Sequence, residues 1–425
     1  MLDLKLIRSN KNEVEKALLK RLDKDSFDLD AIIRLDDERR ILIQEIEKKK
    51  SLRNQASHTK PDPETIANMK AVGEEIKLLE EKLSVKELAL ETVLAELPNT
   101  PADDVVAGGK ENNEVIFTGG RLPEFSFPFK NHVDLAVDLG LIDYERAVKM
   151  SGSGFWCYTG NGALLEWALL SYFVDFHTKN GYNFLMPPYL LSEKSAYTSG
   201  HLPKFKDELF WTQDNLCLNA TSEMMLGNYH REEILPESEL PKKYFSYSSC
   251  FRREAGSYRQ EERGMVRGHQ FNKIEMFIFC RPEESEPLFD ELSLNARKLV
   301  EGLGLHFQIS KLAAGDCSFA MKKTCDLEVY LPSMGIYKEV SSISNAGDYQ
   351  AIRGQVRFKS KQSGKNEFVH TLNASGLATS RIFPAILEQF QQEDGSVVIP
   401  EVLHRYLPAG LTVLKPLIKS ENSGN

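Results

Sequence analysis

Between residues 30 and 97 the apolar positions follow the period of a coiled coil. In the second half they alternate three- and four-residue steps, a heptad seam broken only by Lys86: Met69, Val72, Ile76, Leu79, Leu83, Leu90, Val93 and Leu97. The first half keeps this spacing with Ile32, Leu35, Leu42 and Ile46. Pro61 and Pro63 forbid one continuous helix. The pattern predicts an antiparallel helical hairpin with a basic run, KKKSLR, near its tip.

The pattern changes near residue 110. The stretch LPNTPADDVVAGGKENNE is rich in prolines, glycines and acids and is typical of a linker. After it the aromatic content rises, and helical and strand periods alternate. We expect two domains: residues 1–110, which contain the helical arm at 30–97, and residues 111–425, with an α+β fold.

A long helix and a proline-bearing strand are expected between residues 162 and 191. The apolar stripe of NGALLEWALLSYFVDFHTK has the helical period, and Asn180-Gly181 is a stop signal. In the following strand Pro187 and Pro188 lack the amide hydrogens that a central strand needs. This strand therefore lies at a sheet edge or where two subunits meet.

The stretch FRREAGSYRQEERGMVRGHQFNKIEMF, residues 251–277, concentrates functional groups on one strand face. Strand alternation puts Arg252 and Glu254 on one face of the first strand. In the returning strand it puts Arg267, Phe271, Lys273 and Glu275 on one face and the apolar Ile274, Met276 and Ile278 on the other. Arginine forks suit phosphate oxygens, and a phenylalanine among them offers a stacking surface for a base. On these residues alone, a nucleotide site and a solvated hairpin both remain open.

Two later runs carry weaker signals. KEVSSIS, residues 338–344, places Glu339 among hydroxyl side chains, the oxygen ligands that a hard cation prefers. In NASGLATSRIFPAILEQF, Arg381 lies at the start of an apolar-striped helix, where a phosphate meets free backbone amides. An ordinary strand end and an ordinary capped core helix explain each run equally well.

Composition narrows the class of protein. The chain has 425 residues and a net charge of −9, which excludes a uniformly basic nucleic-acid coat but leaves a local basic patch open. The six cysteines form no CxxC pair, so we expect reduced thiols rather than zinc ligands or disulfides. The start has no signal-peptide pattern and no later run has membrane length, so we expect a cytoplasmic protein without a membrane partner.

Taken in order, these motifs resemble those of class II aminoacyl-tRNA synthetases, and the whole chain is similar to bacterial-type seryl-tRNA synthetases. The motifs are MLDLKLIR, the helical arm, the long helix with its proline strand, ATSE at 220–223, FRRE at 251–254, RGHQF at 267–271, EVSS at 339–342 and SGLATSR at 375–381. The resemblance implies an antiparallel β-sheet catalytic domain flanked by helices, and a coiled-coil arm. It also implies ATP-dependent activation of L-serine, transfer to tRNA(Ser) and also to tRNA(Sec), magnesium, and a homodimer.

The resemblance also assigns roles to particular residues. Arg252 and Arg381 are the implied catalytic arginines on the phosphates, with Glu254 and Phe271 on adenine. The implied ATP site is Arg252, Arg253, Glu254, Val266, Arg267, Phe271, Glu339, Val340, Ser341, Ser342 and Arg381. Glu339 and Ser342 are the implied magnesium ligands. The implied serine site is Thr221, Ser222, Glu223, Glu275, Asn373 and Ser375. In the arm, Lys48, Lys49, Lys50 and Arg53 are the expected tRNA contacts.

Some positions depart from the family pattern, and other functions stay open. Ser380 replaces the glycine before the last arginine, Ala374 replaces a glycine, and Pro384 lies within the helix that follows. The loop 257–262 carries unusually large residues. The alternatives are a non-catalytic paralogue, a ligase that charges a carrier protein, and a prolyl- or threonyl-type enzyme. The retained site residues argue against the paralogue, and the arm argues against the carrier-protein ligase. The short stretch after Arg381 argues against the prolyl- or threonyl-type enzyme.

Overall fold

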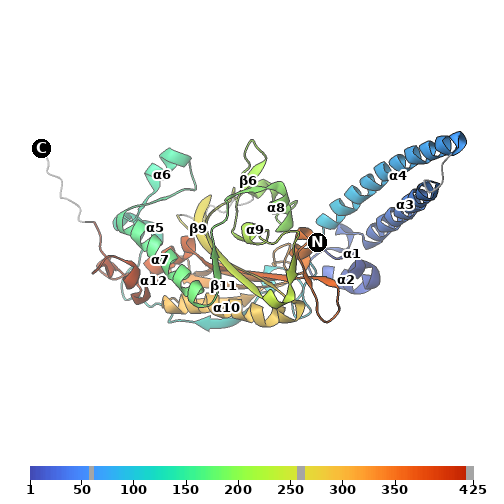
Figure 1. Cartoon of the computed structure of the whole chain (residues 1–425). Coiled ribbons are helices and arrows are strands. Elements are labelled where there is room, and N and C mark those ends of the chain that lie inside the picture. Colours follow the sequence, from blue (N-terminus) through green and yellow to red (C-terminus); the bar gives the residue numbers. More distant parts are fainter. Residues whose placement is uncertain (57–61, 256–263, 418–425) are drawn as a thin grey trace. The chain divides into compact units, whose positions relative to one another are not determined.

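The computed structural model describes residues 1–56, 62–255 and 264–417. They form two compact units, Met1–Thr100 and Pro101–Asn425 (Figure 1). No helix in these ranges is both long enough and apolar enough to cross a membrane. The six cysteines are unpaired thiols, and all but Cys157 are buried.

The first unit consists mainly of two long helices. α1 (Leu4–Ser9) and α2 (Lys11–Leu18) precede α3 (Leu29–Ala56), and α4 (Pro63–Ala95) follows. Ion pairs from Lys49 to Glu75 and from Lys86 to Glu38 show that α3 and α4 run antiparallel. Within the seam Ile76 and Leu90 are buried, whereas Leu88, two positions away, is 67% exposed. The predicted hairpin and its apolar seam are confirmed.

A buried carboxylate fixes the base of this hairpin. The Asp36 side chain is fully buried and accepts from Arg8 of α1 at 3.1 Å. Arg39 and Arg40, on the next turn of α3, pair with the same carboxylate at 2.8 Å each. The three arginines are themselves partly exposed, so the buried group whose charge needs these partners is the Asp36 carboxylate. This cluster therefore ties α1 to the arm.

The second unit is built on a sheet that, among the described residues, has eight strands. Their order is β1 (Glu114–Gly119), β10 (Phe307–Lys311), β11 (Lys323–Leu331), β12 (Ile336–Gly347), β15 (His370–Ala378), β9 (Gln270–Cys280), β8 (Lys242–Phe251) and β4 (Asn183–Leu185). All neighbours pair antiparallel except β4 and β8. β4 lies at the sheet edge, one of the two places predicted for this segment, but Pro187 and Pro188 are not in a strand: β4 ends at Leu185 and the next strand, β5 (Leu190–Ser192), begins after them.

Helices cover one face of this sheet. α5 (His132–Asp138), α7 (Gly160–Lys179), α10 (Ser285–Gly302) and α12 (Thr379–Gln389) share one core with Ile274, Met276 and Ile278 of β9. The alternate residues of β9 point to the opposite face, where α8 (Glu193–Thr198) and α9 (Glu223–Leu226) lie (Figure 1). α11 (Tyr349–Gly354) packs on this face too, through Ala351 and the rings of Phe277 and Phe279. The α+β architecture with an antiparallel-dominated sheet flanked by helices is confirmed.

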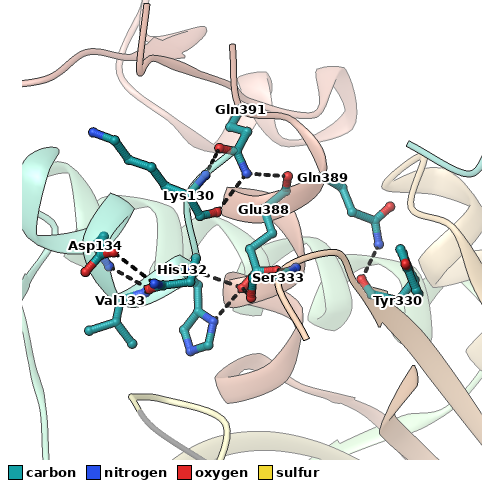
Figure 2. A network of polar contacts seen from close by, with 10 residues as sticks. Lys130, His132, Val133, Asp134, Tyr330, Ser333, Glu388, Gln389 and Gln391 are labelled. Carbon is teal, nitrogen blue, oxygen red and sulfur yellow. Dashed lines mark hydrogen bonds and ion pairs between the residues drawn. The ribbon is translucent and has the colours of Figure 1, made fainter. Parts of the chain in front are cut away.

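A buried polar network holds the end of α12. Glu388 accepts hydrogen bonds from the backbone amide of His132 at 3.0 Å and from the Ser333 amide at 2.9 Å, and it contacts His132 Nδ1 at 2.7 Å (Figure 2). Burial acts to raise the pKa of Glu388, but these hydrogen bonds hold it below its ordinary value. The helix that begins beside Arg381 is thus anchored at its far end.

Candidate active site

The sheet face that carries α8, α9 and α11 also bears a cavity of about 850 Å³. Its walls come from β9, β11, β12 and β15, from the segments after β8 and before β9, and from the loop at 199–209. Phe271, Lys273 and Glu275 line it, as the alternation of β9 predicts. Arg252, Glu254 and Arg267 line it too, although they lie outside the strands, because β8 ends at Phe251 and β9 begins at Gln270.

One group of cavity residues combines positive charge with an aromatic face. The Arg252 guanidinium lies 5.2 Å from the centre of the Phe271 ring, and its Nε donates to the Ala220 carbonyl at 3.3 Å. Glu254 has a positive φ of 52°, which turns the chain out of the strand. Its carboxylate accepts from Arg267 at 2.7 Å. The arrangement offers fixed donors for phosphate and a flat surface for a base.

Arg381 is held by backbone oxygens. Its NH1 donates to the Glu339 carbonyl at 2.6 Å, and its Nε approaches the Val266 carbonyl at 3.4 Å. The Glu339 carboxylate lies 3.5 Å from the same guanidinium. Since Arg381 follows directly on the end of β15, the start of α12 delivers it to this wall of the cavity.

A second group is small, polar and buried. Lys273 and Glu275 form a short ion pair in which both side chains are almost fully buried. The Lys273 ammonium also donates to Thr221 Oγ1 at 2.7 Å, and Ser375 Oγ lies 3.3 Å from Glu275. Charges removed from water need such partners. The cluster suits a small zwitterion that carries a hydroxyl group.

Glu223 adds a second carboxyl group to this cluster. Its Oε1 accepts from Gln350 Nε2 at 2.7 Å, and Gln350 in turn accepts from the Thr371 hydroxyl at 2.7 Å. Burial, and after it the charge of Glu275, raises the pKa of Glu223 to about 7. A cationic ligand beside the two carboxyl groups would favour their charged forms.

His201 stands beside the same cluster as a neutral base. Its Nδ1 is 2.9 Å from the Ser199 hydroxyl. Burial lowers the pKa of His201 to about 3, and the positive charges of Arg252, Lys273 and Arg353 act in the same direction. His201 therefore contributes a polar, uncharged wall to the cavity.

The candidate cation ligands lie on neighbouring strands. Glu339 and Ser342 of β12 line the cavity, and Asp326 of β11 pairs in register with Ser342. Asp326 Oδ1 is buried and has no hydrogen-bond partner among the described residues. Those residues contain no group of three acids, histidines or cysteines placed to enclose an ion. The oxygen donors fit magnesium, which takes one or two protein ligands and completes its shell with phosphate and water.

The structure brings most of the predicted site residues into this one cavity. Its lining includes Thr221, Glu223, Arg252, Glu254, Val266, Arg267, Phe271, Glu275, Glu339, Val340, Ser342, Asn373, Ser375 and Arg381. Three others stand outside the lining. Ser222 is buried against Ser248 at 2.7 Å, and Ser341 donates to the Ser375 carbonyl at 2.6 Å. Arg253 is exposed, and the loop 257–262 lies outside the described residues.

Sequence reasoning gave no role to several lining residues. Lys273 was visible on the functional face of β9, yet only the structure shows its pairing with Glu275. Asp326 and Glu328 alternate with buried Cys325, Leu327 and Val329, a period-two signal that would have found them. His201, which lines the cavity, and Gln350, which is outside the lining and donates to Glu223, come from other elements and carry no local pattern.

The predicted tRNA contacts lie near the end of α3. Lys48 and Arg53 are exposed, whereas Lys49 and Lys50 form ion pairs with Glu75 and Glu80 of α4. The basic tip is therefore partly neutralised, and Lys48 and Arg53 offer the more accessible charge.

The architecture and the cavity are those of a class II aminoacyl-tRNA synthetase. Residues 204–390 match the tRNA synthetase class II core domain (G, H, P, S and T). Six of the eight strands of the sheet, the arginine and phenylalanine cradle, and Arg381 in the first turn of α12 fall within this range, whereas β1 and β4 lie before it.

Further comparisons narrow the class to one family. Residues 1–101 match the seryl-tRNA synthetase N-terminal domain. The serine–tRNA ligase 2 of Clostridium acetobutylicum is 52% identical over 96% of this chain and 99% of its own. A Pyrococcus horikoshii seryl-tRNA synthetase crystallised with ATP is similar, with a TM-score of 0.90, 32% identity and coverage of 98% and 100%. The cytoplasmic serine–tRNA ligase of Naegleria fowleri with AMP has a TM-score of 0.86, 30% identity and coverage of 98% and 99%. The chain belongs to the seryl-tRNA synthetase family.

Proposed function

We propose that this chain is an ATP-dependent serine–tRNA ligase. In the first step, a serine carboxylate oxygen bonds to the α-phosphorus of ATP, the bond to the β-phosphate oxygen breaks, and pyrophosphate leaves. In the second, a terminal ribose hydroxyl of tRNA attacks the seryl carbonyl and AMP leaves. The observation that carries the proposal is one cavity that joins the Arg252–Phe271 cradle to the buried Lys273–Glu275 pair.

Positioning and charge stabilisation are the main demands of the first step. Attack at phosphorus needs in-line placement and stabilised phosphoryl oxygens rather than a strong protein base. In our assignment Arg252 binds the α-phosphate, Phe271 and Arg381 take the two faces of adenine, and Arg381 also reaches the γ-phosphate. Glu254 accepts from the adenine amino group, and Arg267 contacts the triphosphate. These residues line a common wall, which supports the assignment.

The buried polar group would recognise serine. We assign the ammonium to Thr221, Glu223 and Glu275, and the side-chain hydroxyl to Glu275 and Ser375, with Asn373 beside them. Alanine would leave these buried polar groups unpaired, a penalty that allows discrimination on the order of 10⁴-fold. The supporting geometry is the 3.3 Å separation between Ser375 Oγ and Glu275.

Magnesium fits the remaining oxygen donors. Glu339 and Ser342 would hold it on β12, with Asp326 next to Ser342. Bound there, the ion would neutralise charge on the phosphates. The carboxylate of Glu339 already faces Arg381, so one side chain borders both the cation position and the phosphate position.

The arm supplies the proposed tRNA contact. A helical hairpin recognises RNA through shape and phosphate charge, and Lys48 and Arg53 are exposed for it. Because this recognition does not read the anticodon, a tRNA with a different anticodon can also bind. We therefore include tRNA(Sec) as a substrate in the proposal. Because tRNA charging serves protein synthesis, we place the enzyme in the cytoplasm.

A homodimer is supported by apolar side chains on α7 and around β4. Trp167 is 61% exposed and Met186 is 73% exposed, with Leu164 and Phe184 also accessible. Exposed apolar patches of this kind mark contact surfaces. Trp167→Glu should shift the mass measured by light scattering from that of a dimer to that of a monomer. A wild-type monomer would refute this part of the proposal.

The central test is serine-dependent exchange of pyrophosphate into ATP. We expect exchange with serine, none with proline or threonine, and charging of tRNA(Ser) and tRNA(Sec) transcripts by the full chain. Exchange with another amino acid, or none at all, would overturn the assignment. Charging of an acyl carrier protein instead of tRNA would identify the carrier-ligase alternative.

A further inference from the structure

Glu166 is a buried carboxyl group outside the cavity that contacts two segments of its wall. It lies on α7 and is 5% exposed. Its Oε1 accepts from Thr379 Oγ1 at 2.6 Å and from Asn272 Nδ2 at 2.8 Å. Thr379 is two residues before Arg381, and Asn272 is next to Phe271. One oxygen atom thus meets both segments that carry the adenine-stacking side chains.

Asn272 is itself a junction of hydrogen bonds. Its Oδ1 accepts from Ser249 Oγ at 3.0 Å and from the Tyr247 hydroxyl at 3.2 Å, both on β8. Its carbonyl lies 3.1 Å from Thr379 Oγ1, so the single proton of that hydroxyl is shared between this carbonyl and Glu166. The Asn272 side-chain NH₂ group therefore donates to Glu166, while the side-chain oxygen accepts from β8 and the backbone carbonyl contacts α12. Only one orientation of the side chain satisfies these contacts.

The position of Glu166 coincides with the end of a backbone ladder. β15 and β9 pair irregularly after Ser375 and Glu275, and the last pair is Ala378 with Lys273. Beyond it the chain turns into α12, so the Thr379 side chain replaces the next ladder bond. Without Glu166, the Thr379 hydroxyl would keep only its longer contact with the Asn272 carbonyl, and α12 would lose this hydrogen bond to α7 at the point where it leaves the sheet.

Burial raises the pKa of Glu166 to about 7, while Thr379, Asn272 and the nearby Tyr158 hydroxyl oppose the shift. Since both hydrogen bonds end on one acceptor oxygen, an amide oxygen at the same place would accept them equally well. A glutamine is therefore the conservative replacement.

We propose that Glu166 is a positioning residue that sets the separation of Phe271 and Arg381 and so shapes the adenine-binding slot. The inference rests on the proposed function, because it concerns ATP binding in the same cavity. Lys273 and Glu275 have their own partners in Thr221 and Ser375, so the serine group does not depend on Glu166.

The experiment compares four variants of the full chain in serine-dependent pyrophosphate exchange: Glu166→Ala, Glu166→Gln, Thr379→Val and Tyr172→Phe. The control, Tyr172→Phe, removes another buried hydrogen bond of α7, from Tyr172 to the Leu299 carbonyl at 3.2 Å. We expect Glu166→Ala to raise KM for ATP about tenfold, the size of effect expected when buried donors lose their acceptor, with KM for serine nearly unchanged. Thr379→Val should shift the same constant in the same direction, and Glu166→Gln should restore it.

The inference fails if Glu166→Ala and Tyr172→Phe lower the melting temperature alike and leave KM for ATP alike, since Glu166 would then be structural only. It also fails if Glu166→Gln is as impaired as alanine. Should the alanine variant not fold, Thr379→Val decides, because an unchanged KM for ATP there excludes the positioning role. An inactive wild type would instead refute the proposed function.

Discussion

The helical arm and the sheet cavity use charge in opposite ways. Toward the tip of the arm, beyond the Asp36 cluster, the basic side chains lie at the surface, and a pair such as Lys50 with Glu80 remains about half exposed. In the cavity Lys273 and Glu275 are buried against each other, and each has a further partner. Exposed pairs contribute little because water screens them, whereas breaking a buried pair leaves an uncompensated charge.

This difference predicts how each region responds to substitution. The charged residues near the arm tip act almost independently, and their effects should be small and additive. Cavity residues share partners, so one replacement should disturb several functions at once. The following changes test that contrast in order of expected effect.

The largest effect is expected for Arg381→Ala. Without Arg381, one preorganised positive charge no longer stabilises the negative charge that develops on the phosphates. Such a loss lowers the rate on the order of 10²- to 10³-fold. Pyrophosphate exchange should fall by that amount while circular dichroism stays unchanged. Arg381→Lys should remain impaired, because a lysine lacks the planar fork. A lysine variant with full activity would contradict the assigned role.

Leu90→Ala should destabilise the arm by roughly 2–3 kcal/mol, because it empties a buried seam position. Leu88→Ala is the matched control, since Leu88 is 67% exposed whereas Leu90 is 5% exposed; its expected cost is about 0.5 kcal/mol or less. Amide hydrogen exchange across α3 and α4 measures both. Equal protection in the two variants would show that the seam is not the source of stability.

Serine binding should weaken as the pH falls below neutrality. The folded-state pKa of Glu223 is raised to about 7, so the carboxylate that would accept the serine ammonium is protonated below this pH. KM for serine should therefore rise on acidification, and Glu223→Gln should flatten the profile at a high KM. The pKa of Glu223 also depends on Glu275, Lys273, Gln350 and Arg252, so the variant should differ from the wild type at Glu223 alone. An unaltered profile in the variant would assign the titration to another group.

The smallest effect is expected in the arm. Replacing Lys48 and Arg53 with glutamate should raise KM for tRNA several-fold. Charging should also become less sensitive to salt, by the amount expected for the loss of about two phosphate contacts. Exchange without tRNA should stay at the wild-type rate. The same pair of changes at Lys49 and Lys50 should do less, because Glu75 and Glu80 already neutralise those lysines.

The contrast also explains what could be predicted from the sequence. A single heptad period determines which faces of α3 and α4 meet, and alternation along β9 separates Phe271, Lys273 and Glu275 from the core. These patterns are local. The contributions of Gln350, His201 and Glu166 were missed because each comes from an element distant in sequence and shows no period. Arg252 and Arg267 were expected on strands, but β8 ends at Phe251, just before Arg252, and β9 begins at Gln270, after Arg267.

Two arginines of the proposed nucleotide site form ion pairs within the protein, and these pairs have a consequence for selectivity. Arg267 is neutralised by Glu254, and Arg381 faces Glu339, so these two arginines present little net attraction to a lone small anion. Free phosphate would have to displace these carboxylates with one contact, while a nucleotide brings a base, a ribose and several phosphates that compensate for the exchange. The carboxylates of the protein thus compete with small anions for the arginines. This competition would keep simple phosphates from occupying the site and leave it available to ATP.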